Sequence, residues 1–324
     1  MKLSVAVSFL LSAGALCLLL SPRVAAWFLD QPNERSLHAS PVPRTGGLAI
    51  VPALAVGLLV AGGDRLLVLL AAALMLLSVL DDWRRLPAGW RLLGHLAAAA
   101  VFARAGFPVA GWLELVLLTL AVGWMINLYN FMDGADGLAG GMTVIGFCAY
   151  AAAAALAGNA NYAVASLCVA SAAFAFLLFN FPPARIFMGD AGSIPLGFLA
   201  AAFGALGWRD GLWPLWFPLV VFAPFVVDAS VTLVKRGMRG ERVWQAHRSH
   251  YYQRLVLTGW SHRRLAVSEY ALMLLGSGAA LLALHRPAAM QVVIVAALAV
   301  IYLSAGLTID RRWRAQERAA PGGE

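Results

Sequence analysis

Four polar residues stand three positions apart in an otherwise apolar chain: Asn127, Asn130, Asp133 and Asp136. On a continuous helix this spacing places them roughly on one face. Amides and carboxylates in one stripe at the end of a hydrophobic helix are costly in lipid, so they indicate a functional site. The glycines within 134–141 predict a backbone that turns there and lets a ligand approach closely.

Carboxylates also stand where two other apolar runs end or begin. Asp81 and Asp82 are adjacent. Two carboxylates this close hold one proton more tightly than either would alone, which suits proton abstraction. Asp190 stands between glycines just before an apolar run, where a carboxylate and free backbone N–H groups could hold Mg²⁺ and a phosphate. The structural alternatives are an interfacial stop signal at Asp81-Asp82 and a helix N-cap at Asp190.

His247, Arg248 and His250 lie within four residues of one another, in the long basic segment 235–264, which holds eight Lys and Arg residues. A basic loop alone is most often a sign of membrane orientation. The His and Arg side chains packed together here predict a phosphate clamp instead. A zinc site is disfavoured because the spacing offers at most two ligands and no cysteine is near.

Composition places all these groups in a membrane protein. The chain has 324 residues, of which 61% are hydrophobic and 12% charged, with a mean hydropathy of +0.78. A soluble domain is nearer half apolar and a quarter charged. The net charge of +8 is read as basic loops facing an anionic leaflet, not as a nucleic-acid surface.

Apolar runs of about 20 residues predict an all-α, polytopic fold with about eleven transmembrane helices, or ten if one is re-entrant. The first run is read as a span and not as a signal peptide, because it is long and only Lys2 precedes it. The predicted spans are 3–29, 46–62, 65–80, 91–105, 112–130, 138–157, 161–180, 192–208, 213–234, 265–284 and 288–306.

The distribution of Lys and Arg predicts the orientation. Eighteen of the 24 cationic residues fall in one alternate set of segments, which by the positive-inside rule is the cytoplasmic set. This puts the N-terminus outside, and 235–264 and the tail 307–324 in the cytoplasm. Residues 1–324 then form a single membrane domain, without internal repeats.

All the acids discussed so far, together with Asp228, then fall at the cytoplasmic ends of spans. Six acids from four segments at one membrane face predict a single acidic pocket open to the cytoplasm. Hard oxygen ligands with Arg and His nearby are typical of Mg²⁺ and phosphate binding. We therefore expect a water-soluble diphosphate donor and a lipid acceptor to meet there.

These segments resemble the polyprenyl-phosphate N-acetylhexosamine-1-phosphate transferase family, in the glycosyltransferase family 4 branch that initiates O-antigen. The matching pieces are P-N-x-R-S-x-H…P-x-P-R-x-G-G at 32–47, D-D at 81–82, N-x-x-N-x-x-D-G-x-D-G-L at 127–138, F-N-x-P-x-A-R-I-F-M-G-D-x-G-S at 179–193 and the late His segment. They touch every predicted cytoplasmic segment except the tail.

The resemblance implies transfer of N-acetylhexosamine-1-phosphate from a UDP-amino-sugar to undecaprenyl phosphate, with release of UMP. It implies that Asp81 or Asp82 handles the lipid phosphate as a base, and that Asp190, with Asp133, binds Mg²⁺, which Mn²⁺ could replace. The residues implied in substrate binding are Arg44, Asn127, Asn130, Asp133, Asp136, Asn180, Phe187, His247, Arg248 and His250, with Phe187 stacking on uracil and the last three on the diphosphate.

The resemblance also implies a multi-pass protein of the bacterial inner membrane with a cytoplasmic active site. One departure narrows the branch: the family often has three His in its late motif, whereas this chain has H-R-S-H-Y-Y at 247–252. That points away from the muramyl-peptide branch and towards enzymes of lipopolysaccharide O-antigen or similar glycans. N-acetylglucosamine, N-acetylfucosamine and N-acetylquinovosamine donors stay open, as does a homodimer.

Other classes fit less well. A CDP-alcohol phosphotransferase would need D-G-x-x-A-R from Asp133, and a UbiA-like prenyltransferase would need D-x-x-x-D pairs; both patterns are missing. An ion-coupled transporter or flippase would place charges near the bilayer midplane and show repeat symmetry.

Overall fold

A computed structural model describes residues 2–25, 29–30, 41–243, 245 and 247–319. The elements in chain order are α1 (Lys2–Leu19), α2 (Pro22–Ala25), β1 (Leu29–Asp30), β2 (Val42–Pro43), α3 (Gly46–Val60), α4 (Arg65–Arg84), α5 (Ala88–Gly106), α6 (Trp112–Phe131), α7 (Leu138–Leu156), α8 (Ala160–Asn180), α9 (Asp190–Arg209), α10 (Trp216–Val221), α11 (Ala223–Met238), α12 (Tyr251–Leu257), α13 (His262–Ala283) and α14 (Ala288–Ala319). The motif at 32–38 lies outside the described residues.

The all-α, polytopic prediction is confirmed. Within the described residues, eight helices are long and apolar enough to cross a membrane: α1, α4, α6, α7, α8, α9, α13 and α14. The apolar α3 is shorter, and β1 and β2 are a two-residue antiparallel pair. Helices occur at each predicted span, but how many of them cross, and in which direction, stays a prediction.

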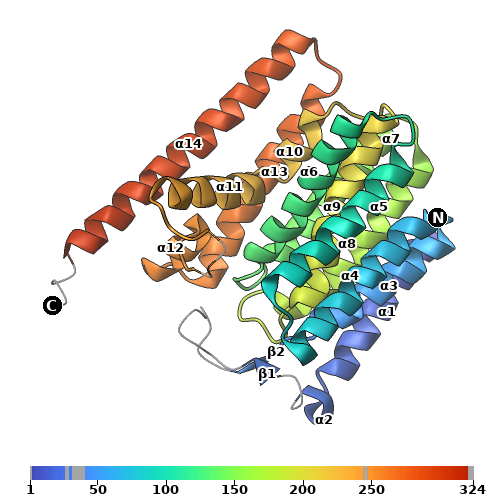
Figure 1. The fold of residues 1–324 in the computed structure, drawn as a ribbon, viewed down its shortest axis with the longest axis horizontal. Helices are drawn as coiled ribbons and strands as arrows, with labels where there is room; N and C mark the ends of the chain where they lie inside the picture. Colours follow the sequence, from blue (N-terminus) through green and yellow to red (C-terminus); the bar gives the residue numbers. More distant parts are fainter. Residues whose placement is uncertain (1, 26–28, 31–40, 244, 246, 320–324) are drawn as a thin grey trace.

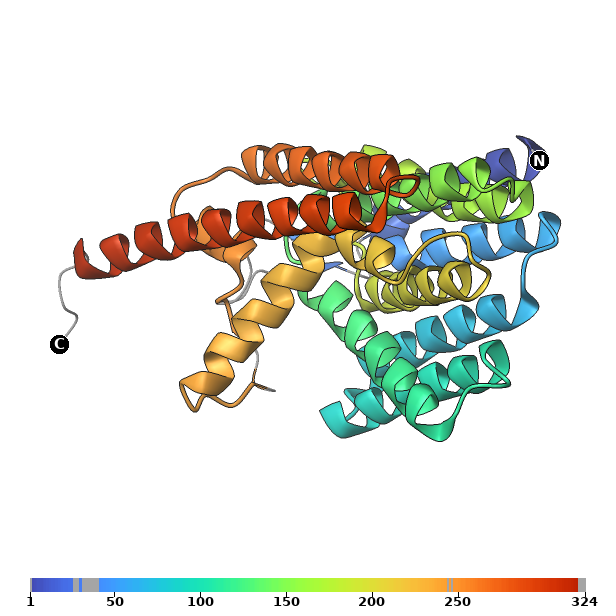
Figure 2. The same cartoon turned by 90° about the horizontal axis from the view of Figure 1, so that it is seen from above.

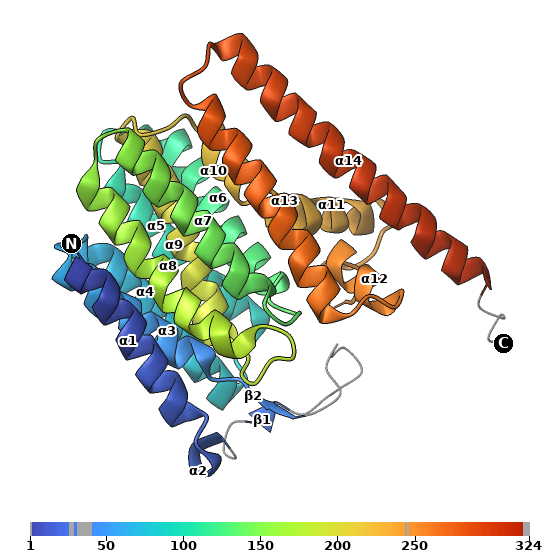
Figure 3. The ribbon, with the colours of Figure 1, turned by 180° about the vertical axis from the view of Figure 1, so that it is seen from behind.

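The helix α9 is the centre of the bundle. It contacts α3, α4, α5, α6, α7 and α10, and it is the most buried of the eight candidate spans. Glycine and alanine make up much of its sequence, and small residues let neighbouring backbones approach closely in membrane proteins. Figures 1 and 3 show α9 enclosed by its neighbours, with α14 at the edge. The first residue of α9, Asp190, is therefore carried by the most enclosed helix.

The structure corrects two predicted spans. The run 3–29 is not one helix: α1 ends at Leu19, and the short α2 and β1 follow. The run 213–234 is broken into α10 and α11 around Phe222, next to Pro224. A proline lacks the N–H that a continuous helix would need, so a break in the helix beside Pro224 is expected. After the break, α11 turns across the direction of its neighbours (Figure 1).

Two segments predicted as cytoplasmic loop or tail contain helix. The segment 235–264 contains the end of α11, the whole of α12 and the start of α13. The segment 307–324 continues α14 as far as Ala319. Figure 2 shows α13 and α14 running together along one side of the molecule. Charged residues ended the predicted spans, but a helix continues beyond the apolar stretch wherever no Gly or Pro stops it.

The helices α4, α6 and α8 end, and α3, α5 and α9 begin, at the end of the bundle that carries β1 and β2 (Figure 1). We call this the acidic end, because Asp81, Asp133 and Asp190 all lie there. At the opposite end the helices are joined by short turns, such as residues 61–64 and 157–159. The prediction that the acids gather at one end of the bundle is thus met by the topology.

Candidate active site at the acidic end

Asp190 lies at the centre of a cluster of opposite charges. Its Oδ1 accepts a hydrogen bond from the Arg44 guanidinium, and its Oδ2 lies 4.0 Å from Nη1 of Arg91. The same Nη1 lies 2.9 Å from Oδ2 of Asp81, so Arg91 bridges the two carboxylates. The side chain of Asp190 is 11% exposed, whereas those of Arg44 and Arg91 are 41% and 38% exposed. The two cations are therefore partly exposed to solvent, while the acid between them is largely buried.

The backbone before α9 sets the direction of Asp190. Gly189 precedes it with φ 70°, and a Cβ at Gly189 would lie 2.9 Å from Cγ of Arg44, so only glycine fits without strain. Asn130 Nδ2 lies 3.5 Å from Oδ2 of Asp190, and Ser193 Oγ donates to Asn130 Oδ1 at 2.8 Å. Asp190 is the first residue of α9 rather than its N-cap, so its carboxylate points to the arginines, near a positive helix end.

Arg44 is brought to this cluster by a backbone pairing far apart in sequence. The N–H of Phe187 donates to Pro43 O, and the N–H of Gly46 donates to Phe187 O, both at 2.8 Å. The pairing joins the start of α3 to the segment before α9. It leaves Phe187 partly exposed.

Asp81 and Asp82 differ sharply in their surroundings. Asp81 accepts from the N–H of Leu86 at 2.8 Å and from Arg91 at 2.9 Å, so both of its oxygens are engaged. Asp82 is exposed, and no hydrogen bond from the described part of the chain reaches its carboxylate. Arg44 and Asp190 are close enough to act on its charge. Of the two acids, Asp82 is the one free to take a proton.

The polar stripe predicted from 127 to 136 is interrupted, because α6 ends at Phe131. The prediction of one helix face is therefore wrong for Asp133 and Asp136. They lie in the turn before α7, which closes at Gly137 with φ 77°, a conformation that favours glycine. Asn127 stays on the helix, donates to Gly123 O at 2.7 Å and contacts His95.

Asp133 turns towards the charge cluster. Burial raises the pKa of Asp133 to about 8, and the charge of Asp190 adds to this rise. Arg44 and a hydrogen bond from the Gly189 backbone act in the opposite direction. At neutral pH the carboxyl group therefore tends to keep its proton in the free protein. A cation that binds there must displace this proton.

Asp136 and Asn180 hold two loops together. Asp136 Oδ2 accepts from the N–H of Ala184 at 3.0 Å, and its Oδ1 lies 3.1 Å from Nδ1 of His262. Asn180 accepts from the N–H of Gly137 at 2.9 Å and donates to Ile186 O at 2.8 Å. These contacts tie the turn before α7 to the segment before α9. Their predicted role in substrate binding stays a prediction.

The segment 247–250, which we call the His loop, is held by Asp228 of α11. Asp228 is buried, and its carboxylate accepts from the N–H groups of Tyr251 and Tyr252, both at 2.9 Å. The Nδ1 of His250 lies 3.2 Å from the same carboxylate. The rings of His247 and His250 are 4.7 Å apart. Arg248 is exposed, so it is free to meet an anion.

The His loop lies against the end of α6, two residues from Asp133. The His250 ring stacks on Phe131 with centroids 6.0 Å apart, and Tyr252 OH donates to Phe131 O at 3.0 Å. Burial lowers the pKa of His247 to about 4, and the nearby His250 and Arg236 add to the fall. At neutral pH His247 is therefore uncharged, while the exposed Arg248 carries a positive charge.

Comparison with known proteins shows which family this chain is similar to. The profile of Glycosyl transferase family 4 matches residues 65–207. A Bacillus subtilis protein named as a probable undecaprenyl-phosphate N-acetylglucosaminyl 1-phosphate transferase is 30% identical over 262 residues, covering 75% of this chain and 73% of the relative. A Mycobacterium tuberculosis decaprenyl-phosphate N-acetylglucosaminephosphotransferase is 32% identical, covering 74% and 71%.

A Synechococcus phospho-N-acetylmuramoyl-pentapeptide-transferase is 34% identical over 319 residues, covering 82% of this chain and 85% of the relative. The chain belongs to the polyprenyl-phosphate hexosamine-1-phosphate transferase family. The resemblance inferred from the motifs is thereby confirmed. The relatives are named for both N-acetylglucosamine and muramoyl-pentapeptide transfer, so membership of the family leaves the sugar open.

In this family member, sequence reasoning missed two residues that organise the site. Arg91, the first residue of the predicted span 91–105, was not among the candidate site residues, yet it joins Asp81 to Asp190. Asp228 counted only as one more acid near a span end, yet it caps α12 below the His loop. A signal existed for Asp228, since it is the one acid of α11 and lies in an apolar run.

Proposed function

We propose that this protein transfers N-acetylhexosamine-1-phosphate from a UDP-amino-sugar to undecaprenyl phosphate, releasing UMP, as the first step of O-antigen or a related surface glycan. The acidic end would face the cytoplasm of the bacterial inner membrane, where nucleotide sugars are found. The observation that carries this proposal is the charge cluster of Asp190, Arg44, Arg91 and Asp81, which lies beside the free carboxylate of Asp82.

The donor set fits Mg²⁺. Within the described residues no three His, Cys, Asp or Glu side chains gather closely enough to form a metal cage. Mg²⁺ is usually held by one or two carboxylates together with water and substrate phosphates, so a full cage is not needed. Asp190 and Asp133, which lie close enough to interact electrostatically, are the two carboxylates that would hold it. When bound, the ion would neutralise charge on the donor diphosphate.

The other residues of the site would each have a separate role in the reaction. Asp82 would take the proton of the lipid phosphate, whose oxygen attacks the phosphorus attached to the sugar. The bond from that phosphorus to UMP then breaks, and UMP leaves with the bond electrons. Arg248 would stabilise the charge on the diphosphate, and Phe187 would stack on uracil. A reaction of this kind needs mainly alignment and fixed positive charge.

The test is release of UMP by the purified protein with undecaprenyl phosphate, Mg²⁺ and a panel of UDP-amino-sugars. We expect UMP with at least one N-acetylhexosamine donor and only when the lipid is present. Asp190→Asn should lower the rate by more than about 100-fold, because it removes a carboxylate that would hold the Mg²⁺ ion beside the reacting phosphates.

Asp210→Asn is the matched control. Asp210 pairs with Arg209 at 2.7 Å at the opposite end of the bundle, so its loss should leave UMP release unchanged. Unchanged UMP release in Asp190→Asn would remove Asp190 from the site. No UMP release with any donor would refute the proposed reaction.

A further inference from the structure

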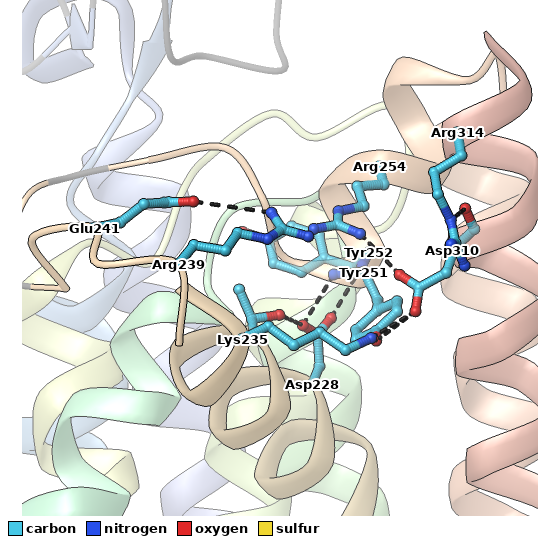
Figure 4. A network of polar contacts seen from close by, with 10 residues as sticks. Asp228, Lys235, Arg239, Glu241, Tyr251, Tyr252, Arg254, Asp310 and Arg314 are labelled. Carbon is cyan, nitrogen blue, oxygen red and sulfur yellow. Dashed lines mark hydrogen bonds and ion pairs between the residues drawn. The ribbon is translucent and has the colours of Figure 1, made fainter. Parts of the chain in front are cut away.

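The last helix, α14, touches the rest of the protein at few points. Only 6% of its apolar stretch is buried, and between α11, α13 and α14 lies a cavity of about 400 Å³. At one end of α14, Trp216 Nε1 donates to Gln291 at 3.0 Å. At the other end, Asp310 makes the contacts shown in Figure 4. Because the middle of α14 is loosely packed, these two ends fix its position.

Asp310 connects α14 to both helices beside the His loop. Its Oδ1 lies 2.9 Å from Nη1 of Arg254 on α12, and its Oδ2 accepts from Lys235 on α11. Tyr251 OH lies 3.3 Å from Oδ2. The side chains of Asp310 and Arg254 are 12% and 7% exposed, so this pairing is largely shielded from water. Shielded charges of this kind depend strongly on one another.

The length of α14 places this contact at the membrane surface. From Ala288 to Ile309 its sequence is almost wholly apolar and would extend about 33 Å, which matches a hydrocarbon core of about 30 Å. Asp310 and the arginines after it therefore begin where the lipid headgroups lie. Because lipid surrounds the apolar stretch of α14, Asp310 stays at a constant depth relative to the membrane.

The residues that contact Asp310 on α12 lie directly after the His loop in the chain. Tyr251 and Arg254 are on α12, whose N-cap is His250. Asp228 fixes the first turn of α12 from α11, and Tyr252 fixes it to the end of α6. Asp310 supplies the third attachment, from the side facing α14. The position of α12, and with it the height of the His loop, is thus set from three helices.

We propose that Asp310 is a positioning residue for the His loop: it holds α12 against α14 and α11, so that the loop meets the diphosphate of the nucleotide-sugar donor. This inference rests on the proposed function. Asp310 itself touches neither substrate. It acts through Arg254 and Tyr251.

The test is steady-state kinetics of Asp310→Asn, with the KM of the donor and of the lipid acceptor measured separately. Small displacements of a binding group lower kcat/KM by about 10- to 100-fold. We expect a loss of this size, through a higher donor KM with an unchanged acceptor KM. Asp310→Glu keeps the charge and should recover most of the loss. Gln291→Ala, which removes the other attachment of α14, should keep the wild-type donor KM.

A donor KM at the wild-type value in Asp310→Asn would overturn the inference, even if the yield of folded protein falls. An equal rise in donor KM in Gln291→Ala would also overturn it, because the effect would then come from loosening α14 as a whole. If Asp310→Asn cannot be purified, Tyr251→Phe decides: a raised donor KM supports the inference and wild-type kinetics refute it. Asp190→Asn in the same assay separates this result from failure of the proposed function.

Discussion

At the acidic end, Asp190, Arg44 and Arg91 hold one another in a cluster that is partly open to water, whereas towards the opposite end a group of aromatic rings is enclosed in the bundle. There the rings of Tyr150 and Trp213 lie 5.0 Å apart and nearly parallel. Trp213 Nε1 donates to Gly204 O, and Tyr150 OH donates to Ala200 O, both at 3.0 Å. One end is thus built on charges and the other on enclosed rings whose polar atoms bond to backbone.

The two ends differ in whether their polar side chains remain available to a ligand. Trp213 is 3% exposed and Tyr150 is fully buried, and both have partners, so neither has a surface to offer a ligand. Arg44, Arg91 and Asp82 are partly or fully exposed, so a substrate phosphate can reach them. Substitutions at the acidic end should therefore change catalysis, and substitutions at the aromatic end should change stability.

The largest effect that sharpens this comparison is expected at the aspartate pair. Asp82→Asn should lower kcat by about 10²- to 10⁴-fold, the usual contribution of a general base. Asp81→Asn should act differently, because Asp81 holds Arg91 and through it Asp190. In Asp81→Asn we expect the Mg²⁺ concentration needed for half-maximal UMP release to shift. Equal kinetic changes in both variants would contradict the division of roles.

At the aromatic end, Trp213→Ala should lower the free energy of unfolding by about 3 kcal/mol, because it leaves a cavity beside Tyr150. The measurement is the thermal unfolding midpoint in detergent. The kcat of the protein that remains folded should equal that of the wild type. A large fall in kcat per folded molecule would break the distinction between the two ends.

The smallest effect concerns His247, whose pKa of about 4 in the folded protein lies below the usual 6.5. Between these two values the unfolded chain binds a proton that the folded protein does not, so stability falls as the pH drops from 6.5 towards 4. Because His247 is half-buried, the loss by pH 5.5 should stay below about 1 kcal/mol. The unfolding midpoint of His247→Gln should vary less with pH, while Trp213→Ala should keep the wild-type pH dependence.

Several features of the site could be predicted from the sequence. Asp190 and the aspartate pair were recognised because carboxylates beside apolar runs are rare and have few structural explanations. Arg91 was missed because an arginine at a span end fits the positive-inside rule equally well. The stripe from Asn127 to Asp136 was extended too far, since periodicity does not show where α6 stops.

By itself the sequence determined the membrane class, the positions of most helices along the chain and which acids stand at their ends. Apolar length and charged breaks are local properties of the chain, and they act in the same way wherever the helices pack. Only the tertiary structure decided which acid is free, as Asp82 is, and which is engaged, as Asp81 is. It alone joined Asp310 to the His loop. Both outcomes depend on which cation from a distant segment reaches a given carboxylate, and spacing along the chain does not encode this.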